Sequence, residues 1–296
     1  MKKVYLRLLI FSLLIFTACK THSDKEVKSN ENNSNDVLVD ELHLPAKVSR
    51  VLGLCPSSTE ILASICPEKL VGRTQNCNFP PSIETLPIVN NYPLDIEGVM
   101  KLRPDLVLTL EGITPMDDIK RIEALGIPVY IQNFKTVDEV FEGIRDVGKI
   151  CGAKVKADLL VDSLTHIKDS LLSQSFGEKL SAINIIWNAP IYVHGYYSIM
   201  TDKLRIAGMN NIIDSSFKKT SPEVSREYLL SKNPDVMFCA FSDYEKDFFN
   251  LYPELRRMKC YRNKAIFKIT EDLQSRPGPR ILEAVMELKN ISKNAR

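Results

Sequence analysis

Short apolar runs and longer amphipathic stretches alternate along residues 47–291. In the first half, the apolar runs predict strands and the stretches between them have helical spacing. Strands separated by helices predict parallel βαβ units, and therefore an α/β fold. The predicted strands are 51–54, 70–72, 105–110 and 129–131, and the helices are 58–65, the turn after Asp95, and 116–125. The same order returns with strands 183–187, 235–240 and 265–269 and helices 199–207, 227–230 and a terminal one from Pro279.

One longer amphipathic stretch separates these halves. Residues 153–174 carry apolar side chains at helical spacing, with no glycine or proline. At about 1.5 Å per residue, this stretch makes a helix roughly 33 Å long. We therefore predict two Rossmann-like lobes with central parallel sheets, 44–150 and 177–296, joined by one long α-helix within 151–176. The ligand cleft is expected between the lobes, at the carboxyl ends of the strands.

Two segments, 95–108 and 225–238, repeat one pattern of a capped helix followed by a strand. Glu227 lies 130 positions after Glu97, and the two Pro-Asp pairs that end the helices are the same distance apart. An aspartate or serine before each glutamate is a good helix N-cap. The repeat predicts two lobes that are built alike.

The N-terminus has the pattern of a secretory signal. Residues 1–7 are basic and residues 8–16 are almost wholly apolar, a stretch too short to span a bilayer as mature structure. Residues 16–19, Phe-Thr-Ala-Cys, resemble a bacterial lipobox and imply cleavage after residue 18 and acylation of Cys19. A second interpretation is an ordinary secretory signal followed by a coincidental cysteine. The polar segment 19–43 is predicted to be a flexible tether from the lipid to the folded body.

Removal of residues 1–18 changes the charge balance. The loss of Lys2, Lys3 and Arg7 takes the formal net charge of the 296-residue chain from +2 to −1. Neither value suggests a nucleic-acid partner. No later apolar stretch is long enough to cross a membrane. We predict a monomer in the periplasm of the cell envelope, attached to a membrane through its lipid.

Cysteine and histidine spacing gives no metal or redox motif. No CxxC pattern occurs, and six cysteines after Cys19 leave their pairing open. The histidines are too scattered for a three-histidine site, so we expect no metal site and no cofactor. The cysteines are Cys55, Cys66, Cys77, Cys151, Cys239 and Cys260, and the histidines are His22, His43, His166 and His194.

An enzyme is the rival class of function. Ser57 and Ser58 follow a predicted strand, but no G-x-S-x-G motif surrounds them. Neither G-x-G-x-x-G nor G-x-x-x-x-G-K-[ST] is present, so nucleotide binding has no fingerprint. We favour a non-catalytic protein. An envelope enzyme or a scaffold lipoprotein remains the alternative.

Six ordered runs of residues resemble one family of transport proteins. That family is the helical-backbone class (class III) of ABC-transporter solute-binding proteins, and the likeness is greatest to its vitamin B12-binding branch. The last run reads Arg-Pro-Gly-Pro-Arg. The runs are 47–62, 72–81, 102–108, 125–129, 222–227 and 276–280.

The resemblance implies capture of a corrinoid, vitamin B12 (cobalamin), and its delivery to an ABC permease in the inner membrane. Haem or a ferric siderophore is the alternative ligand for the same fold. Glu97 and Glu227 match the two glutamates, one in each lobe, that dock onto permease arginines in this family. Carboxylates at exposed helix starts can make such charge-assisted bonds. Each could instead only favour its own helix dipole.

The resemblance also suggests ligand contacts. The aromatic candidates are Tyr92, Trp187 and Tyr196, for which packing within a lobe is the competing interpretation. The polar candidates Asp272 and Arg276 could instead form a surface salt bridge.

Two positions depart from the vitamin B12-binding branch. Asn76, which we also expect to contact the ligand, and Leu110 stand where that branch has a tyrosine and a tryptophan. The cysteine pair of its second lobe has no match here. These departures keep the haem and siderophore alternatives open.

Overall fold

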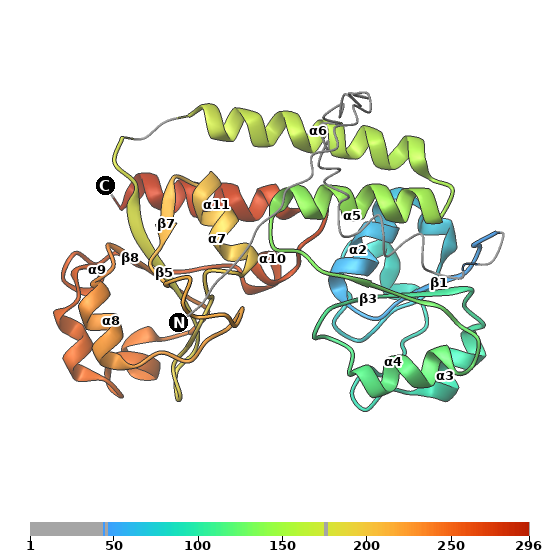
Figure 1. Cartoon of the computed structure of the whole chain (residues 1–296), viewed down its shortest axis with the longest axis horizontal. Coiled ribbons are helices and arrows are strands. Elements are labelled where there is room, and N and C mark those ends of the chain that lie inside the picture. Colours follow the sequence, from blue (N-terminus) through green and yellow to red (C-terminus); the bar gives the residue numbers. More distant parts are fainter. Residues whose placement is uncertain (1–43, 45–46, 175–176, 296) are drawn as a thin grey trace, which may run out of the picture. The chain divides into compact units, whose positions relative to one another are not determined.

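The computed structural model describes residues 44, 47–174 and 177–295 (Figure 1). The predicted signal 1–18, the lipidation site Cys19 and the tether 19–43 lie outside the described residues. The first lobe contains a four-stranded sheet with the order β2-β1-β3-β4, and all its pairings are parallel. Its strands are β1 (Val51–Gly53), β2 (Leu70–Gly72), β3 (Leu106–Leu110) and β4 (Val129–Gln132).

Helices connect these strands as the apolar pattern predicts. The predictions for three of them are confirmed, whereas the fourth, α5, was not predicted as a separate helix. Its start carries a capping box in which Thr136 and Glu139 each bond the other's backbone N–H. This signal is readable in the sequence. The helices are α2 (Pro56–Ile65), α3 (Ile96–Leu102), α4 (Met116–Glu123) and α5 (Val137–Ile150), with short 3₁₀ turns η1 (Pro67–Lys69) and η2 (Pro81–Thr85).

The sheet of the second lobe is parallel except for one short strand. β5 (Leu180–Trp187) pairs in parallel with β8 (Val236–Cys239) and, over its first half, with β7 (Met209–Asn211). β9 (Ile266–Lys268) pairs in parallel with β8. β6 (Tyr192–Val193) pairs antiparallel with the last residues of β5. Only four residues connect β5 to β6, and such a short connection can return the chain only as an antiparallel neighbour.

Apart from α11, the helices of the second lobe have at most eight residues. Four of them, including the terminal one, cover the sheet, and the rest form a compact segment between β8 and β9. They are α7 (Ile199–Ile206), α8 (Arg226–Lys232), η3 (Glu245–Phe249), η4 (Pro253–Arg257), α9 (Lys259–Arg262), α10 (Glu271–Ser275) and α11 (Ile281–Asn294).

The long connecting helix is confirmed as α6 (Lys154–Ser173). It packs along α5 of the first lobe and against α7 and α11 of the second (Figure 1). One hydrophobic cluster runs through this region and includes Ile61 and Ile144 from the first lobe, Leu164 from α6, and Met200 and Phe238 from the second lobe. The lobes therefore share a continuous core in addition to the connecting helix. None of the described helices is both long and apolar enough to cross a membrane.

The two repeated segments fold alike. Asp95 caps α3 by accepting the N–H of Gly98 at 2.9 Å, and Ser225 caps α8 in the same way at 3.1 Å. The aspartate of each Pro-Asp pair then ties its strand to the first strand of the lobe. Asp105 accepts the two backbone N–H groups just before β1 at 2.8 and 2.9 Å, and Asp235 accepts the N–H of Ser181 in β5 at 2.9 Å. The repeat therefore encodes a complete helix-to-strand unit.

Candidate functional site

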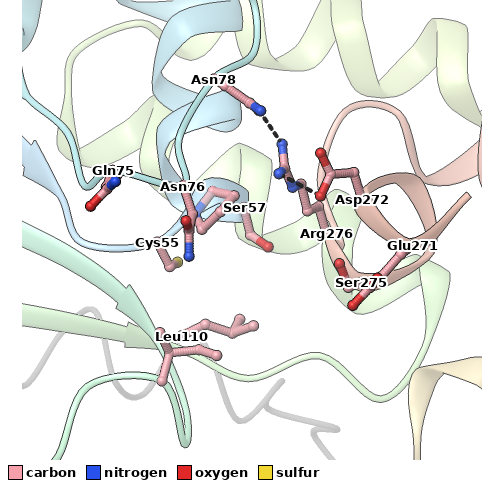
Figure 2. A pocket seen from close by; sticks show the side chains of 12 residues that line it. Cys55, Ser57, Gln75, Asn76, Asn78, Leu110, Glu271, Asp272, Ser275 and Arg276 are labelled. Carbon is pink, nitrogen blue, oxygen red and sulfur yellow. Dashed lines mark hydrogen bonds and ion pairs between the residues drawn. The ribbon is translucent and has the colours of Figure 1, made fainter. Parts of the chain in front are cut away.

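A cavity of about 500 Å³ lies at the carboxyl ends of β1 and β3 (Figure 2). The loop after β2 contributes the amide side chains of Gln75, Asn76 and Asn78, and the turn into α2 contributes Ser57. The second lobe contributes only α10 and the residue that follows it. The position agrees with the rule that ligands of open α/β sheets bind outside the carboxyl ends of the strands.

The turn between β1 and α2 is tight because of one glycine. A Cβ added to Gly53 would lie 2.4 Å from the hydroxyl oxygen of Thr59, so any larger residue would push the helix away from the strand. The Thr59 hydroxyl also donates to the backbone carbonyl of Cys55 at 2.8 Å. This packing brings Cys55 and Ser57 to the cavity wall.

Arg276 connects the two lobes at the cavity wall. Its side chain is 8% exposed, and one guanidinium nitrogen, Nη1, donates to Oδ1 of Asn78 at 2.7 Å. The other, Nη2, pairs with Asp272 at 2.7 Å (Figure 2). Nη1 also lies 3.6 Å from Glu60. Asp272 is exposed, but Arg276 is buried, so this is not a pair between two surface residues.

Glu60 was not predicted as a site residue, although it anchors the whole segment after α10. It is 2% exposed and accepts two hydrogen bonds from Arg280, at 2.9 and 2.7 Å. These bonds raise the pKa of Arg280. The Arg280 guanidinium also lies 3.8 Å from the centre of the Phe79 ring. The sequence did carry a signal for this contact, because Glu60 is a charged residue within the apolar run of α2. A buried carboxylate requires a partner, so such a residue indicates an ion pair elsewhere in the chain.

A second cavity of about 640 Å³ adjoins the first. The two share Glu271 and Asp272, and the second extends to Ala240 and Lys268 at the carboxyl ends of β8 and β9. Together the cavities follow the strand ends of both sheets. The α10 segment therefore lies between the two halves of one extended site.

The structure brings together three of the six predicted ligand contacts. Asn76, Asp272 and Arg276 line the first cavity. The aromatic candidates line neither cavity: Tyr92 is 84% exposed and Trp187 58% exposed. Tyr196 is also exposed, with its ring 5.2 Å from that of Tyr197. Exposed rings are available to stack on a flat ligand, and the three contacts remain predictions.

The two predicted docking glutamates occupy equivalent positions. Glu97 lies in the first turn of α3 and Glu227 in the first turn of α8, and both are exposed. Within the described part of the chain, neither forms an ion pair. Hydrogen bonds from its own backbone N–H and from Ser225 hold the pKa of Glu227 below its usual range. Glu227 is therefore ionised at neutral pH.

The first cavity has few charged side chains on its wall. Its wall carries two carboxylates, Glu271 and Asp272, and one guanidinium that is already paired. Burial raises the pKa of the Cys55 thiol to about 11, so this sulfur stays protonated at neutral pH. Among the residues that the structure describes, no cluster of three or more His, Cys, Asp or Glu side chains is placed to hold a metal ion.

The chain is similar to known periplasmic binding proteins. A model of periplasmic binding proteins matches residues 53–273. The chain is 26% identical, over 95% of its length and 93% of the relative's, to an uncharacterized ABC transporter substrate-binding lipoprotein, YvrC, of Bacillus subtilis.

Solved structures share the fold. The periplasmic vitamin B12-binding protein BtuF of Vibrio cholerae matches with a TM-score of 0.72 and 22% identity, covering 84% of this chain and 98% of its own. The periplasmic heme-binding protein HutB of Vibrio cholerae matches with a TM-score of 0.71 and 18% identity, covering 82% and 98%. Both neighbours have the two-lobed class III fold that the sequence predicted.

Proposed function

The chain belongs to the periplasmic binding protein family, and on that premise we propose that it captures a corrinoid and delivers it to an ABC permease. The family consists of solute-binding transport proteins of the ABC type, which are not enzymes. The activity of the chain is therefore binding and handover. The observation that carries the choice of ligand is the group of amide and hydroxyl side chains that line the first cavity.

The lining suits a ligand whose rim consists of amides. Gln75, Asn76 and Asn78 each offer both a hydrogen-bond donor and an acceptor, and two hydroxyl groups, of Ser57 and Ser275, add to them. A corrinoid ring carries carboxamide side chains, which need donors and acceptors in comparable numbers. The adjoining second cavity leaves room for a ligand that is larger than the first cavity alone.

Haem fits this lining less well. Haem iron is usually held by histidine, tyrosine, methionine or a cysteine thiolate. None of the first three residue types lines either cavity in the described part of the chain, and the Cys55 thiol is protonated at neutral pH. Haem propionates would also require cations, and besides the paired Arg276 the linings of the two cavities offer only Lys268, in the second cavity.

A ferric siderophore with a strongly negative charge meets the same difficulty. The only cationic group on the wall of the first cavity, among the described residues, is Arg276, and its guanidinium is engaged by Asp272 and Asn78. The carboxylates of Glu271 and Asp272 would repel an anion. A ligand without excess negative charge is favoured.

Calorimetric titration tests the choice of ligand. The protein is residues 19–296 with Cys19→Ser, titrated separately with cyanocobalamin, haemin and a ferric siderophore. We expect saturable one-to-one binding of cyanocobalamin only. Binding of haemin or the siderophore without cyanocobalamin would overturn the ligand but keep the transport function. If no chelate binds, the proposal of a chelate receptor fails and the scaffold alternative gains weight.

Docking to the permease is proposed at Glu97 and Glu227. Both carboxylates are exposed, both begin equivalent helices, and neither has an ion-pair partner among the described residues. We expect Glu97→Lys combined with Glu227→Lys to abolish ligand uptake in cells while calorimetry shows unchanged ligand binding. The matched control is Glu84→Lys, another exposed glutamate of the first lobe. Normal uptake by the double variant would remove the docking assignment.

The membrane anchor is proposed at Cys19. The relative YvrC carries the word lipoprotein in its name, and the lipobox-like sequence supports the same chemistry here. A diacylglycerol and an N-acyl chain would exceed the two-signal threshold for stable membrane binding. We expect labelled fatty acid to be incorporated into the wild-type chain and lost in Cys19→Ser. Equal labelling of the two proteins would disprove the anchor.

A further inference from the structure

Two cysteines far apart in the sequence meet at the base of the first lobe. Cys66 ends α2 and Cys151 ends α5, and both side chains are buried, at 0% and 2% exposure. The two side chains lie close enough for each to shift the pKa of the other. The two helices that carry them pack together in the same hydrophobic cluster. The contact is therefore part of the core.

A lysine secures the backbone around this contact. Lys69 donates from Nζ to the carbonyl oxygen of Cys151 at 2.5 Å and to that of Val48 at 2.8 Å. The backbone N–H of Lys69 also bonds the carbonyl of Cys66 at 3.0 Å. One residue thus ties together both cysteine-bearing segments. The backbone at both cysteines is held in place by hydrogen bonds from Lys69.

The other described cysteines differ from this pair. Cys55 is hydrogen-bonded to the Ser58 hydroxyl at 3.2 Å, and Cys77 to the hydroxyls of Thr59 at 3.2 Å and Thr74 at 3.1 Å. Burial raises the pKa values of Cys239 and Cys260. Cys55 and Cys77 also lie near each other, but hydroxyl groups engage both of those thiols. Within the described residues, no hydroxyl group bonds the thiol of Cys66 or Cys151.

We propose that Cys66 and Cys151 form a disulfide bond when the protein matures outside the cytoplasm. Lys69 bonds the backbone carbonyls of both cysteines, and the helices that end at them pack together, so the two side chains meet within one part of the core. The envelope is a compartment in which disulfides form and persist. The bond would enclose β2 to β4 and join the end of α2 to a point three residues before α6.

The chemistry is a thiol–disulfide exchange with a disulfide-bearing oxidoreductase or oxidised glutathione. The thiolate of Cys151 attacks the oxidant's disulfide and releases one thiol, which gives a mixed disulfide. The Cys66 thiolate then attacks Cys151 sulfur and releases the second thiol. Two protein thiols are oxidised, one external disulfide is reduced to two thiols, and the protons remain on those thiols.

Position favours Cys151 as the attacking group. Cys151 lines a cavity of about 300 Å³ together with Lys69 and Gly152, whereas Cys66 does not. The interaction with Cys66 and the nearby charge of Lys69 lower the pKa of Cys151, although burial opposes the shift.

Peptide mapping of the full chain tests the bond directly. The protein is produced with its own leader, extracted from the envelope without reductant, unfolded and alkylated with N-ethylmaleimide. We expect one cross-linked peptide containing Cys66 and Cys151, two hydrogen masses lighter than the sum of its parts. Cys55, Cys77, Cys239 and Cys260 serve as internal controls and should carry the label. Alkylation of Cys66 and Cys151, or linkage of either to another cysteine, would overturn the proposal.

Thermal unfolding supplies a second measurement. A disulfide that closes the loop between residues 66 and 151 stabilises mainly by limiting the unfolded chain. Reductant should lower the melting temperature of the envelope-extracted wild type by about 10 °C. The variant with both Cys66→Ser and Cys151→Ser should melt at the same temperature with and without reductant. If this variant fails to fold, the peptide map of the wild type decides alone.

Discussion

The two lobes contain the same helix-to-strand unit but contribute unequally to the site. In both, a capped short helix leads to a Pro-Asp pair whose aspartate bonds the first strand. The first lobe nevertheless supplies most of the wall of the first cavity through loops after β1, β2 and β3, whereas the second supplies α10 and Arg276. Repeated local sequence therefore produced equivalent scaffolds, and the loops between the repeats produced the difference at the site.

The lobes also bury charge differently. In the first, Arg73 is buried and donates to the backbone carbonyls of Thr74, Cys77 and Glu84. In the second, Lys203 is fully buried and its ammonium donates to the two carbonyl oxygens of Gln274. Burial lowers the pKa of Lys203 to about 7. Lys203 thus holds α10, the one element that the second lobe contributes to the first cavity.

The largest expected effect comes from breaking the contact between the lobes at Glu60. Glu60→Ala leaves Arg280 without its carboxylate in a largely buried position and also removes the neighbour of Arg276. Loss of one partner of a buried pair costs about 3–5 kcal/mol. We expect that decrease in the free energy of unfolding, measured in urea. Glu84→Ala, on the surface, is the control, and a loss below about 1 kcal/mol for Glu60→Ala would contradict the role.

A second prediction concerns pH and the second lobe. Burial, followed by the charge of Lys203, lowers the pKa of His194 from 6.5 to about 3, and its Nδ1 has no hydrogen-bond partner. The unfolded chain takes up a proton on this histidine below pH 6.5, whereas the folded chain does not until about pH 3. The contribution of His194 to stability is therefore complete above pH 6.5 and is lost toward pH 3, by about 1.4 kcal/mol per unit of pKa difference at most.

Replacement of the histidine tests this pH dependence. His194→Asn should flatten the fall in unfolding free energy between pH 6.5 and pH 3, measured by urea titration at several pH values. His166→Asn, on the exposed side of α6, is the matched control and should keep the wild-type slope. An unchanged slope in His194→Asn would assign the pH dependence to other groups.

A third experiment measures how far the two repeated units are equivalent. Asp105→Ala removes the acceptor for two backbone N–H groups, and Asp235→Ala removes the acceptor for Ser181. Hydrogen bonds to a charged group contribute about 1.5–3 kcal/mol. We expect each variant to lose about 2 kcal/mol in urea unfolding, and Asp169→Ala on α6 to lose less than about 0.5 kcal/mol. A clear loss in only one of the two variants would show that the units are not energetically equivalent.

The smallest expected effect is the loss of ligand affinity when an exposed aromatic ring is removed. Trp187→Ala should weaken cyanocobalamin by more than tenfold in calorimetry, which corresponds to about 1.4 kcal/mol. Tyr92→Ala makes the corresponding test in the first lobe. Leu251→Ala, another exposed apolar side chain of the second lobe, is the control. A dissociation constant unaltered by Trp187→Ala would leave that ring with a structural role only.

Much of the fold was predictable because its signals are local. The strands were recognisable as short apolar runs, and α6 as a long amphipathic stretch without glycine or proline. α5 was missed as a separate helix although its capping box was present. β6, β7 and α10 were missed because elements of two to five residues show too little periodicity. These elements lie too close to larger neighbours, or are too short, for the pattern to separate.

The site was only partly predictable for a physical reason. Asn76, Asp272 and Arg276 were expected near the ligand and do line one cavity. Glu60 was not expected, because its partner Arg280 lies 220 positions away and no local pattern connects them. The meeting of Cys66 and Cys151 is equally nonlocal. Pairings of this kind depend on how helices pack after they form.

By itself, the sequence determined the α/β class, the two-lobed plan, the connecting helix and the repeated capped units, because hydrophobic periodicity and capping act over a few residues. Only the tertiary structure decided the continuous core shared by the lobes and the buried contacts of Glu60. The tertiary structure also decided that amides, two carboxylates and one paired arginine line the first cavity. The core, the contacts of Glu60 and this lining all depend on contacts between segments that are distant in the chain.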